Sequence, residues 1–247
     1  MSGAFLVLWN SISSLALQPE YEGWHTFEHV PERVGLPGFI AARRYRSAEP
    51  SGQHPPQYFT CYWLEDIAAL NTARYREVFA KPTAWSARMR SELRDFFRLP
   101  CVLRGSVGVS SASHLATLHL RAAGAGLDGL APAIDAALAA LYAQGGVVSA
   151  QWGSLQEAAD FQIPITQEAT LGTASQPGQD VVLMLHGLDQ AMLVAASNRL
   201  LSTVQALAVP VSAPAFFSLL SEVRQTDLAH PLTERQPPWP DLFARFN

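Results

Sequence analysis

The order of predicted secondary structure elements constrains the fold of this chain most strongly, because the same order occurs twice. Each half reads strand, helix, strand, strand, helix, strand, and the two halves are about 110 residues apart. In the first half these elements are expected at residues 5–9, 19–34, 39–46, 58–64, 67–98 and 101–104. In the second half they are expected at 114–121, 127–142, 147–155, 181–186, 190–207 and 216–223. Little residue identity relates the halves, so the repeat depends on element order alone.

A unit with this order is ferredoxin-like: its helices cover one face of an antiparallel sheet and leave the other face apolar and uncovered. Two such units can bury both uncovered faces if their sheets pack against each other. The segment 58–64 supports this arrangement, because aromatic or apolar residues occur on both of its faces. We therefore predict an α+β fold in which two tandem ferredoxin-like βαββαβ units pack sheet to sheet as an intramolecular α+β barrel.

The predicted domain boundaries follow from the repeat. Residues 1–107 form the first half, which carries the candidate site, 108–223 form the second half as its barrel partner, and 224–247 form a C-terminal tail. The tail is polar and rich in proline until it reaches an apolar cluster, whose residues are Trp239, Leu242, Phe243 and Phe246. Free tails seldom carry such a cluster, so we expect it to dock on the barrel or on a neighbouring subunit.

Composition and charge exclude several classes of protein. With 49% hydrophobic and 15% charged residues, the chain can bury a substantial core. The net charge of −4 leaves no basic stripe for binding phosphates, so we expect no nucleic-acid partner. The basic residues between positions 74 and 98 are interleaved with acidic ones, a mixture that predicts the solvated face of a helix.

The sequence also bears on membrane association and compartment. No apolar run approaches the roughly 18 residues that span a bilayer, and the apolar segment 5–9 lacks the flanks of a signal peptide. Cys61 and Cys101 both lie in apolar predicted strands, as buried inert thiols of a reducing compartment do. We expect a soluble cytoplasmic protein without a membrane partner.

Residues 24–39 contain the most informative group of titratable side chains. His25, Glu28, His29 and Glu32 are three or four residues apart on a predicted helix, a spacing that can bring side chains together on one face. That geometry suits proton transfer or metal binding. The helix is followed by a Pro-Gly-Phe turn signal that leads into the next predicted strand.

The same segment resembles proteins of the dimeric α+β barrel superfamily and, within it, the EthD-like (ethyl tert-butyl ether degradation) family. The residues that carry this resemblance are Trp24, Glu28, His29, Pro31, Glu32, Pro37, Gly38, Phe39, Arg44 and Tyr45. The resemblance covers the first half and implies the barrel fold. The superfamily includes monooxygenases, polyketide cyclases, lactone isomerases and haem enzymes, so it does not determine the reaction. The corresponding helix of the second half, at 127–135, has no Glu-His pair, which implies one site per chain.

Two metal-binding interpretations remain as alternatives. The segment from His25 to His29 matches the H-x-x-E-H string of inverted zinc peptidases, but Pro31 interrupts the helix two residues later. A looser metal site could combine His25 and His29 with a residue from a strand. The sequence contains no Gly-rich phosphate-binding motif and no nucleophile elbow, which argues against nucleotide-dependent and α/β-hydrolase chemistry.

Acid–base chemistry fits the segment better than metal binding does. On an ideal helix, with about 100° per residue, Trp24 and Phe27 face the core, Glu28 lies at the edge of that apolar stripe and His29 falls near the opposite side. His29 would therefore need a distortion at Pro31 to turn inward. The structural alternative is that these polar side chains only cap and pair at the surface.

We therefore predict a small-molecule enzyme with cyclase-like, isomerase-like or monooxygenase-like chemistry. It would act on a hydrophobic metabolite without a cofactor, and the chain could form a homodimer. Glu28 would be the acid/base group, with His29 or His25 as its partner. The predicted substrate-binding residues are Trp24, Arg44, Tyr45 and Tyr62. The alternative is a non-catalytic ligand-binding or stress-related protein of the same fold.

The remaining histidines are weaker candidates. His119 shares a predicted strand face with Thr117 and Arg121 and could line a cleft in the second half. His186 ends an apolar strand, where a histidine usually satisfies a backbone group. His54 and His230 are in predicted loops.

Overall fold

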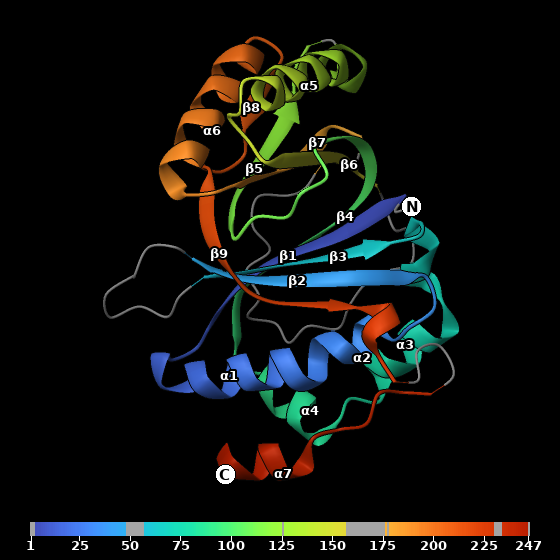
Figure 1. Ribbon diagram of the computed structural model, residues 1–247. Helices are drawn as coiled ribbons and strands as arrows, with labels where there is room; N and C mark the ends of the chain where they lie inside the picture. The colour runs from blue at the N-terminus through green and yellow to red at the C-terminus, as the bar shows by residue number, and fades with distance from the viewer. Residues whose placement is uncertain are drawn as a thin grey trace.

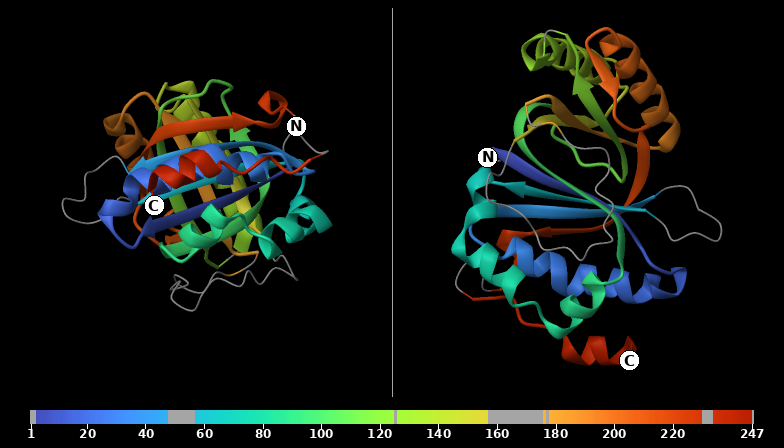
Figure 2. Two further views of the ribbon diagram at one scale, coloured as in Figure 1. Left: turned by 90° about the horizontal axis from the view of Figure 1, so that it is seen from below. Right: turned by 180° about the vertical axis from the view of Figure 1, so that it is seen from behind.

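Antiparallel strands dominate the structure (Figures 1 and 2). The computed structural model describes residues 3–47, 57–124, 126–156, 176, 178–229 and 234–246, so His54 and His230 lie outside the described residues. Within these ranges eight strands close into a barrel in the order β7-β6-β4-β1-β3-β2-β9-β5, and β5 pairs with β7 to complete the circle. The barrel strands are β1 (Ala4–Ile12), β2 (Phe39–Ser47), β3 (Tyr58–Leu64), β4 (Leu93–Val107), β5 (His114–Ala122), β6 (Ser149–Leu155), β7 (Asp180–Gly187) and β9 (Ala215–Arg224). A short strand, β8 (Ala208–Pro210), pairs with the outer part of β5.

The strand order is the same in the two halves of the barrel. The first half supplies four adjacent strands in the order β4-β1-β3-β2, and the second supplies β9-β5-β7-β6. In each half, the first strand in sequence therefore lies between the third and the fourth. The chain has a mixed α+β fold built around an eight-stranded antiparallel barrel. This confirms the predicted α+β class and the predicted barrel.

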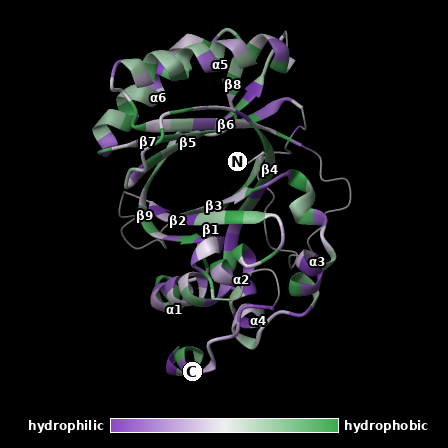
Figure 3. Cartoon of the chain, turned by 45° about the vertical axis from the view of Figure 1, so that its right-hand side comes forward, coloured by the Kyte–Doolittle hydropathy of each residue, from purple (hydrophilic) through white to green (hydrophobic). Residues whose placement is uncertain are grey.

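Two helical layers lie on opposite sides of the barrel, as Figure 3 also shows. The first layer covers β1, β2 and β3, and the second covers the sheet of β5, β6 and β7 (Figure 1). The first layer consists of α1 (Gln18–Trp24), a π-helix (His25–His29), α2 (Val30–Val34), α3 (Ala73–Ala80) and α4 (Ala84–Arg90), together with the 3-10 helices Leu15–Leu17 and Ile67–Asn71. The second layer consists of α5 (Gly126–Ala143) and α6 (Gln190–Val204).

Strand alternation divides the apolar residues between the barrel interior and the helical layers. On β1, Phe5 and Val7 point into the barrel, whereas Leu6 packs toward the first helical layer. Phe59 and Cys61 of β3 also fill the barrel interior. Because β1 and β3 lie between the barrel interior and the first helical layer, both faces of these two strands are apolar.

The predicted helix at 67–98 ends earlier than expected. It consists of a 3-10 turn followed by α3 and α4, and the hydroxyl groups of Thr72 and Thr83 cap the two α-helices. The chain is already extended at Leu93, which pairs with Ile12 of β1. Residues 93–98 therefore belong to β4, because pairing with the long strand β1 overrides their local helical preference.

Helix α5 is long and apolar enough, by length and composition alone, to span a membrane. Its buried residues include Leu130, Ile134 and Leu138, which pack in one apolar cluster with residues of α6 and of the second-half strands. This packing is that of a helix covering a sheet.

The C-terminal segment docks on helices of its own chain. It contains α7 (Pro240–Phe243), the 3-10 turn Ala244–Phe246 and the 3-10 turn Gln225–Asp227 that precedes it. The rings of Phe243 and Phe246 lie 5.6 and 5.9 Å from the ring of Trp85 on α4. Trp239 remains 47% exposed, with its ring 5.8 Å from that of Phe27. The tail thus covers the outer surface of the first helical layer.

Candidate functional site

A cavity of about 320 Å³ lies between the first helical layer and the sheet. Its walls come from β1, β2, β3, the start of β4, the π-helix, and helices α1, α2, α3 and α4. Most of its lining is aromatic or aliphatic. The lining residues are Leu6, Leu8, Asn10, Tyr21, Trp24, His25, His29, Arg33, Phe39, Thr60, Tyr62, Tyr75, Phe79, Pro82, Ala87, Arg90, Ser91, Leu93, Phe96 and Arg98. Both the volume and the mixture of apolar walls with a few polar groups are typical of a small-molecule site.

The π-helix is the local feature that turns two histidines toward this cavity. The N–H of Val30 donates to the carbonyl oxygen of His25, a spacing of five residues. The following residue, Pro31, has no N–H and so cannot make the normal α-helical bond to Phe27. The wider turn places His25 directly beside His29, and their rings stack at 5.0 Å with an interplanar angle of 18°.

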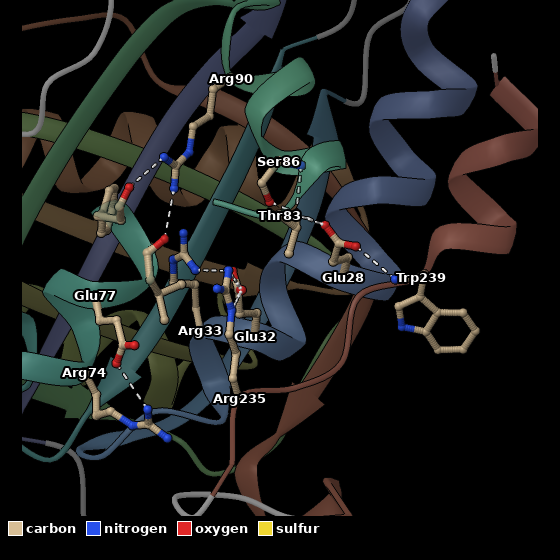
Figure 4. Close-up of polar contacts among 12 residues, drawn as sticks. Glu28, Glu32, Arg33, Arg74, Glu77, Thr83, Ser86, Arg90, Arg235 and Trp239 are labelled. Carbon is tan, nitrogen blue, oxygen red and sulfur yellow. Dashed lines mark hydrogen bonds and ion pairs between the residues drawn. The ribbon is translucent and has the colours of Figure 1, made fainter. Parts of the chain in front are cut away.

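The distortion reverses the orientation that an ideal helix predicts. His29 was expected on the side away from the cleft, yet it lines the cavity with His25. Glu28 was expected to reach the cleft, but its carboxylate faces α4 and the C-terminal segment instead (Figure 4). The reason is the extra residue in the π-turn, which changes the direction of every side chain within it.

Glu28 is buried and fully engaged in structural contacts. One carboxylate oxygen accepts hydrogen bonds from the hydroxyl groups of Thr83 and, at 3.5 Å, Ser86 at the start of α4. The other accepts a hydrogen bond of 3.0 Å from the backbone N–H of Trp239. Glu28 therefore joins the first helix, α4 and the tail (Figure 4).

Both cavity histidines are held in the neutral form. Burial lowers the pKa of His25 well below its usual value, and the charges of Arg44 and Arg33 lower it further. Burial also lowers the pKa of His29 well below its usual value, with Arg33 adding to the effect. The Nδ1 atoms of both rings are buried and have no hydrogen-bond partner among the described residues. Two neutral imidazoles thus line the site, each with a buried Nδ1 atom that has no partner among the described residues.

Three arginines make the cavity electropositive. Arg33, Arg90 and Arg98 line it, and its described lining contains no acidic side chain. The guanidinium groups of Arg33 and Arg90 lie 4.9 and 5.2 Å from the centre of the Phe79 ring. The sequence predicted that the basic residues between 74 and 98 form a solvated helix face. Two of them do not, because Arg90 at the end of α4 and Arg98 on β4 line the cavity.

These arginines are only partly neutralised. Arg33 forms an ion pair with Glu32, which also binds Arg235 at 2.5 Å (Figure 4). Arg90 donates to the backbone carbonyls of Phe79, at 3.0 Å, and Val78, at 3.5 Å. Burial and the nearby Arg33 lower the pKa of Arg90 to about 10, so it stays charged at neutral pH. An anionic group entering the cavity would meet the positive charge of these guanidinium groups.

The predicted substrate-binding residues fall into three different environments. Trp24 and Tyr62 line the cavity, and the Trp24 indole N–H donates to Ser86 at 3.1 Å. The Tyr62 hydroxyl has no hydrogen-bond partner among the described residues, and burial raises the pKa of Tyr62. Arg44 is buried outside the cavity lining, and it donates to the Glu22 carbonyl at 3.2 Å and to the Thr26 hydroxyl. Tyr45 points into the barrel interior.

The sequence interpretation missed the arginines of the site. Arg33 directly follows the predicted motif, but only the π-turn and the packing of Phe79 bring it to the cavity. Recognising that residues 93–98 form a strand would have placed Arg98 on the same face as Phe96, facing the first layer. The side chain of Arg90 gave no such signal.

The described residues do not supply a set of three metal ligands at this site. Among the described residues, no group of three or more His, Cys, Asp or Glu side chains is close enough to hold a metal ion. The looser metal site that combined His25 and His29 with a strand residue therefore lacks a third ligand of these types. Cys61 and Cys101 are buried free thiols in the barrel interior.

The fold and the site together define an α+β-barrel protein with an aromatic, arginine-lined cavity beneath its first helices. No protein-family model matches the sequence. No curated protein sequence matches it either. Comparison of structures does find proteins of similar fold.

Three solved structures illustrate this similarity. An anthrone oxidase-like protein has a TM-score of 0.62 and 11% sequence identity, with 95% of this chain and 99% of that chain covered. A Fusobacterium nucleatum protein provisionally named a monooxygenase has a TM-score of 0.58 and 7% identity, with 91% and 95% covered. A Lactobacillus acidophilus protein with the same provisional name has a TM-score of 0.53 and 8% identity, with 91% and 97% covered. At these identities the similarity establishes the fold alone.

Proposed function

We propose that this chain is a monooxygenase-like small-molecule enzyme that removes a proton from a weakly acidic aromatic substrate and needs no cofactor. The observation that carries the proposal is the pair of neutral imidazoles, His25 and His29, with unbonded Nδ1 atoms in an arginine-lined aromatic cavity. The names of the structural neighbours favour oxygenation over the cyclase-like and isomerase-like alternatives.

The electrostatics support a base that works only when substrate is bound. In the empty cavity a protonated His29 would lie beside the charges of Arg33 and Arg90, which holds its pKa low. A substrate that becomes an anion as it gives up its proton offsets these charges and so makes the imidazole more basic. Arg33, Arg90 and Arg98 would stabilise the developing anion, and His25 or His29 would hold the proton.

A balanced oxidation follows if dioxygen is the second substrate. A CH₂ group flanked by aromatic rings loses a proton to imidazole, and the carbon then forms a bond to dioxygen. The imidazolium returns the proton to the resulting peroxide, which loses water and leaves a ketone. Carbon is oxidised by four electrons, and dioxygen is reduced to one ketone oxygen and one water. Within the cavity, the apolar walls would exclude bulk water from the carbanion.

Anthrone is a suitable probe, because it is a flat aromatic ketone with such a CH₂ group. We expect the protein to accelerate dioxygen uptake and anthraquinone formation. We expect one of the two variants, His25→Gln or His29→Gln, to lower kcat by about 10²–10⁴-fold. That variant identifies the histidine that accepts the proton. His114→Gln, at the start of β5 and outside this cavity, is the matched control and should leave the rate unchanged.

The outcomes separate the proposal from its alternative. Wild-type rates in both cavity variants would contradict the proton-transfer role. Saturable binding of anthrone without turnover would favour a ligand-binding protein of the same fold. Glu28→Gln should keep its turnover, because that carboxylate contacts Thr83 and Trp239 rather than the cavity.

We also propose that the halves 1–107 and 108–223 are tandem ferredoxin-like repeats of an EthD-like ancestor, followed by the tail 224–247. The shared strand order, β4-β1-β3-β2 and β9-β5-β7-β6, supports the duplication. Sequence profiles built separately for the two halves from homologous sequences should align over these elements. Alignment no better than that of unrelated sequences would contradict it.

A further inference from the structure

A second cavity, of about 250 Å³, opens at one end of the barrel. It lies on the other face of β1 and β4 from the first cavity, and both halves of the chain contribute to it. Its floor and walls include Trp9 of β1, Asp95 and Phe97 of β4, and Thr117 and His119 of β5. Asn10 lines both cavities and is the side chain they share.

One buried polar group in this cavity is a histidine that lies beside a carboxylate. His119 is only 5% exposed, and its Nε2 atom lies 3.3 Å from Oδ2 of the fully buried Asp180 on β7. Arg121 fixes that carboxylate with two hydrogen bonds of 2.6 and 3.1 Å, and the backbone N–H of Gln176 adds a third of 2.8 Å. Nε2 lies within ion-pair distance of Oδ2 without an aligned hydrogen bond. A carboxylate this close to Nε2 favours the tautomer that carries its proton there, which leaves Nδ1 of His119 as an acceptor.

The backbone is distorted where it forms the opposite wall. The register of β1 and β4 shifts between Trp9 and Ser11, which marks a β-bulge. Asp95 in this bulge has φ of +48°, in the left-handed region that few residues other than glycine adopt. Its carboxylate accepts a hydrogen bond of 2.6 Å from the Ser11 hydroxyl. Bulges and backbone outliers of this kind concentrate at binding sites, where they redirect side chains.

The charge of this second cavity is opposite to that of the first. Its described lining contains no Arg or Lys, and Asp95 is its one carboxylate. The rings of Trp9 and Phe97 form an aromatic wall, with centroids 5.6 Å apart, and the His119 ring lies 5.5 Å from Phe97. Aromatic faces and a carboxylate attract an organic cation, whereas they offer nothing to a phosphate or carboxylate ligand.

We propose that the barrel-end cavity is a second ligand site that binds a small aromatic amine in its protonated form. Asp95 and the Trp9 and Phe97 rings hold the ammonium group and the flat apolar part. Nδ1 of His119 accepts a hydrogen bond from the ligand, with Asp180 and Arg121 fixing the ring that offers it. The site does not depend on the reaction proposed for the first cavity.

Tyramine is the probe, and 3-(4-hydroxyphenyl)propionate is the anion of similar size and shape. Calorimetric titration of the full chain should show saturable binding of tyramine. Asp95→Asn removes one charge and keeps a residue type that tolerates positive φ, and it should weaken tyramine binding about tenfold. His119→Gln should weaken it as well. Arg90→Met in the first cavity is the matched control and should leave tyramine binding unchanged.

Three results would overturn the proposal. Unchanged tyramine affinity in both Asp95→Asn and His119→Gln would show that tyramine binds elsewhere. Equal affinity for the anion would contradict the charge argument. Absence of saturable tyramine binding up to concentrations on the order of 10 mM would remove the site altogether. Because Asp95 is exposed at the bulge, Asp95→Asn tests the site even if His119→Gln does not fold.

Discussion

The two helix–sheet layers of this protein share a strand order but are filled in different ways. Beneath α5 and α6, buried apolar residues form one continuous cluster with the second-half strands. Beneath α1, α2, α3 and α4, the buried apolar residues divide into two clusters, and the layer holds a cavity with two imidazoles and three arginines. This difference shows that the shared strand order does not by itself require a cavity. The first layer holds one because a π-turn, Pro31 and the inward arginines prevent close packing.

The largest expected effect is the loss of unfolding free energy when equivalent leucines of the two layers are replaced by alanine. Leu118 of β5 and Leu6 of β1 are both buried and both face the helices, but only Leu6 lines the cavity. Leu118→Ala should lower the free energy of unfolding by about 3–5 kcal/mol, because it creates a new void in a filled core. Leu6→Ala should cost only about 2 kcal/mol, because it enlarges a space that already exists. Urea denaturation measures both, and equal losses would break the comparison.

The second expected effect is on the pH dependence of stability. The pKa values of His25 and His29 are lowered in the folded state, so the unfolded chain takes up protons first as the pH falls below about 6.5. Stability should therefore decrease as the pH falls from 6.5 toward the folded-state pKa values, by up to about 1.4 kcal/mol per pH unit for each histidine.

The double variant His25→Gln/His29→Gln provides the measurement. It should show a flatter decline of unfolding free energy between pH 7 and 5 than the wild type shows. His186, whose pKa burial lowers to about 4, remains in both proteins and contributes equally to both slopes. Identical slopes would mean that the two cavity imidazoles are not held neutral.

The smallest expected effect concerns Glu28, which connects the first layer to the C-terminal segment. Glu28→Gln replaces an acceptor of the Thr83 and Trp239 hydrogen bonds with a group that can accept only one of them. The unfolding free energy should fall by about 1–2 kcal/mol. Anthrone turnover should stay within about twofold of wild type. A loss of about 100-fold in a folded variant would instead restore Glu28 as the catalytic group.

Much of the architecture could be predicted because strand alternation and turn signals are local properties. The segment 58–64 was expected as a strand with two apolar faces, and β3 is a strand between the barrel core and the first helical layer. The helix containing His25 and His29 was also expected, together with its role in lining a cleft. The end of the predicted helix at 67–98 was wrong, because pairing of residues 93–98 with β1 is a long-range contact that no local pattern reveals.

By itself, the sequence determined the two-fold order of elements, the apolar character of both strand faces and the concentration of titratable groups at residues 24–32. Only the tertiary structure decided which of these groups face a cavity. That choice depends on the direction of side chains in the π-turn and on charges brought together from distant segments, such as Arg33 and Arg90. Side-chain direction changes with one extra residue in a helical turn, and burial sets the pKa of each group, so neither property can be assigned before the chain is packed.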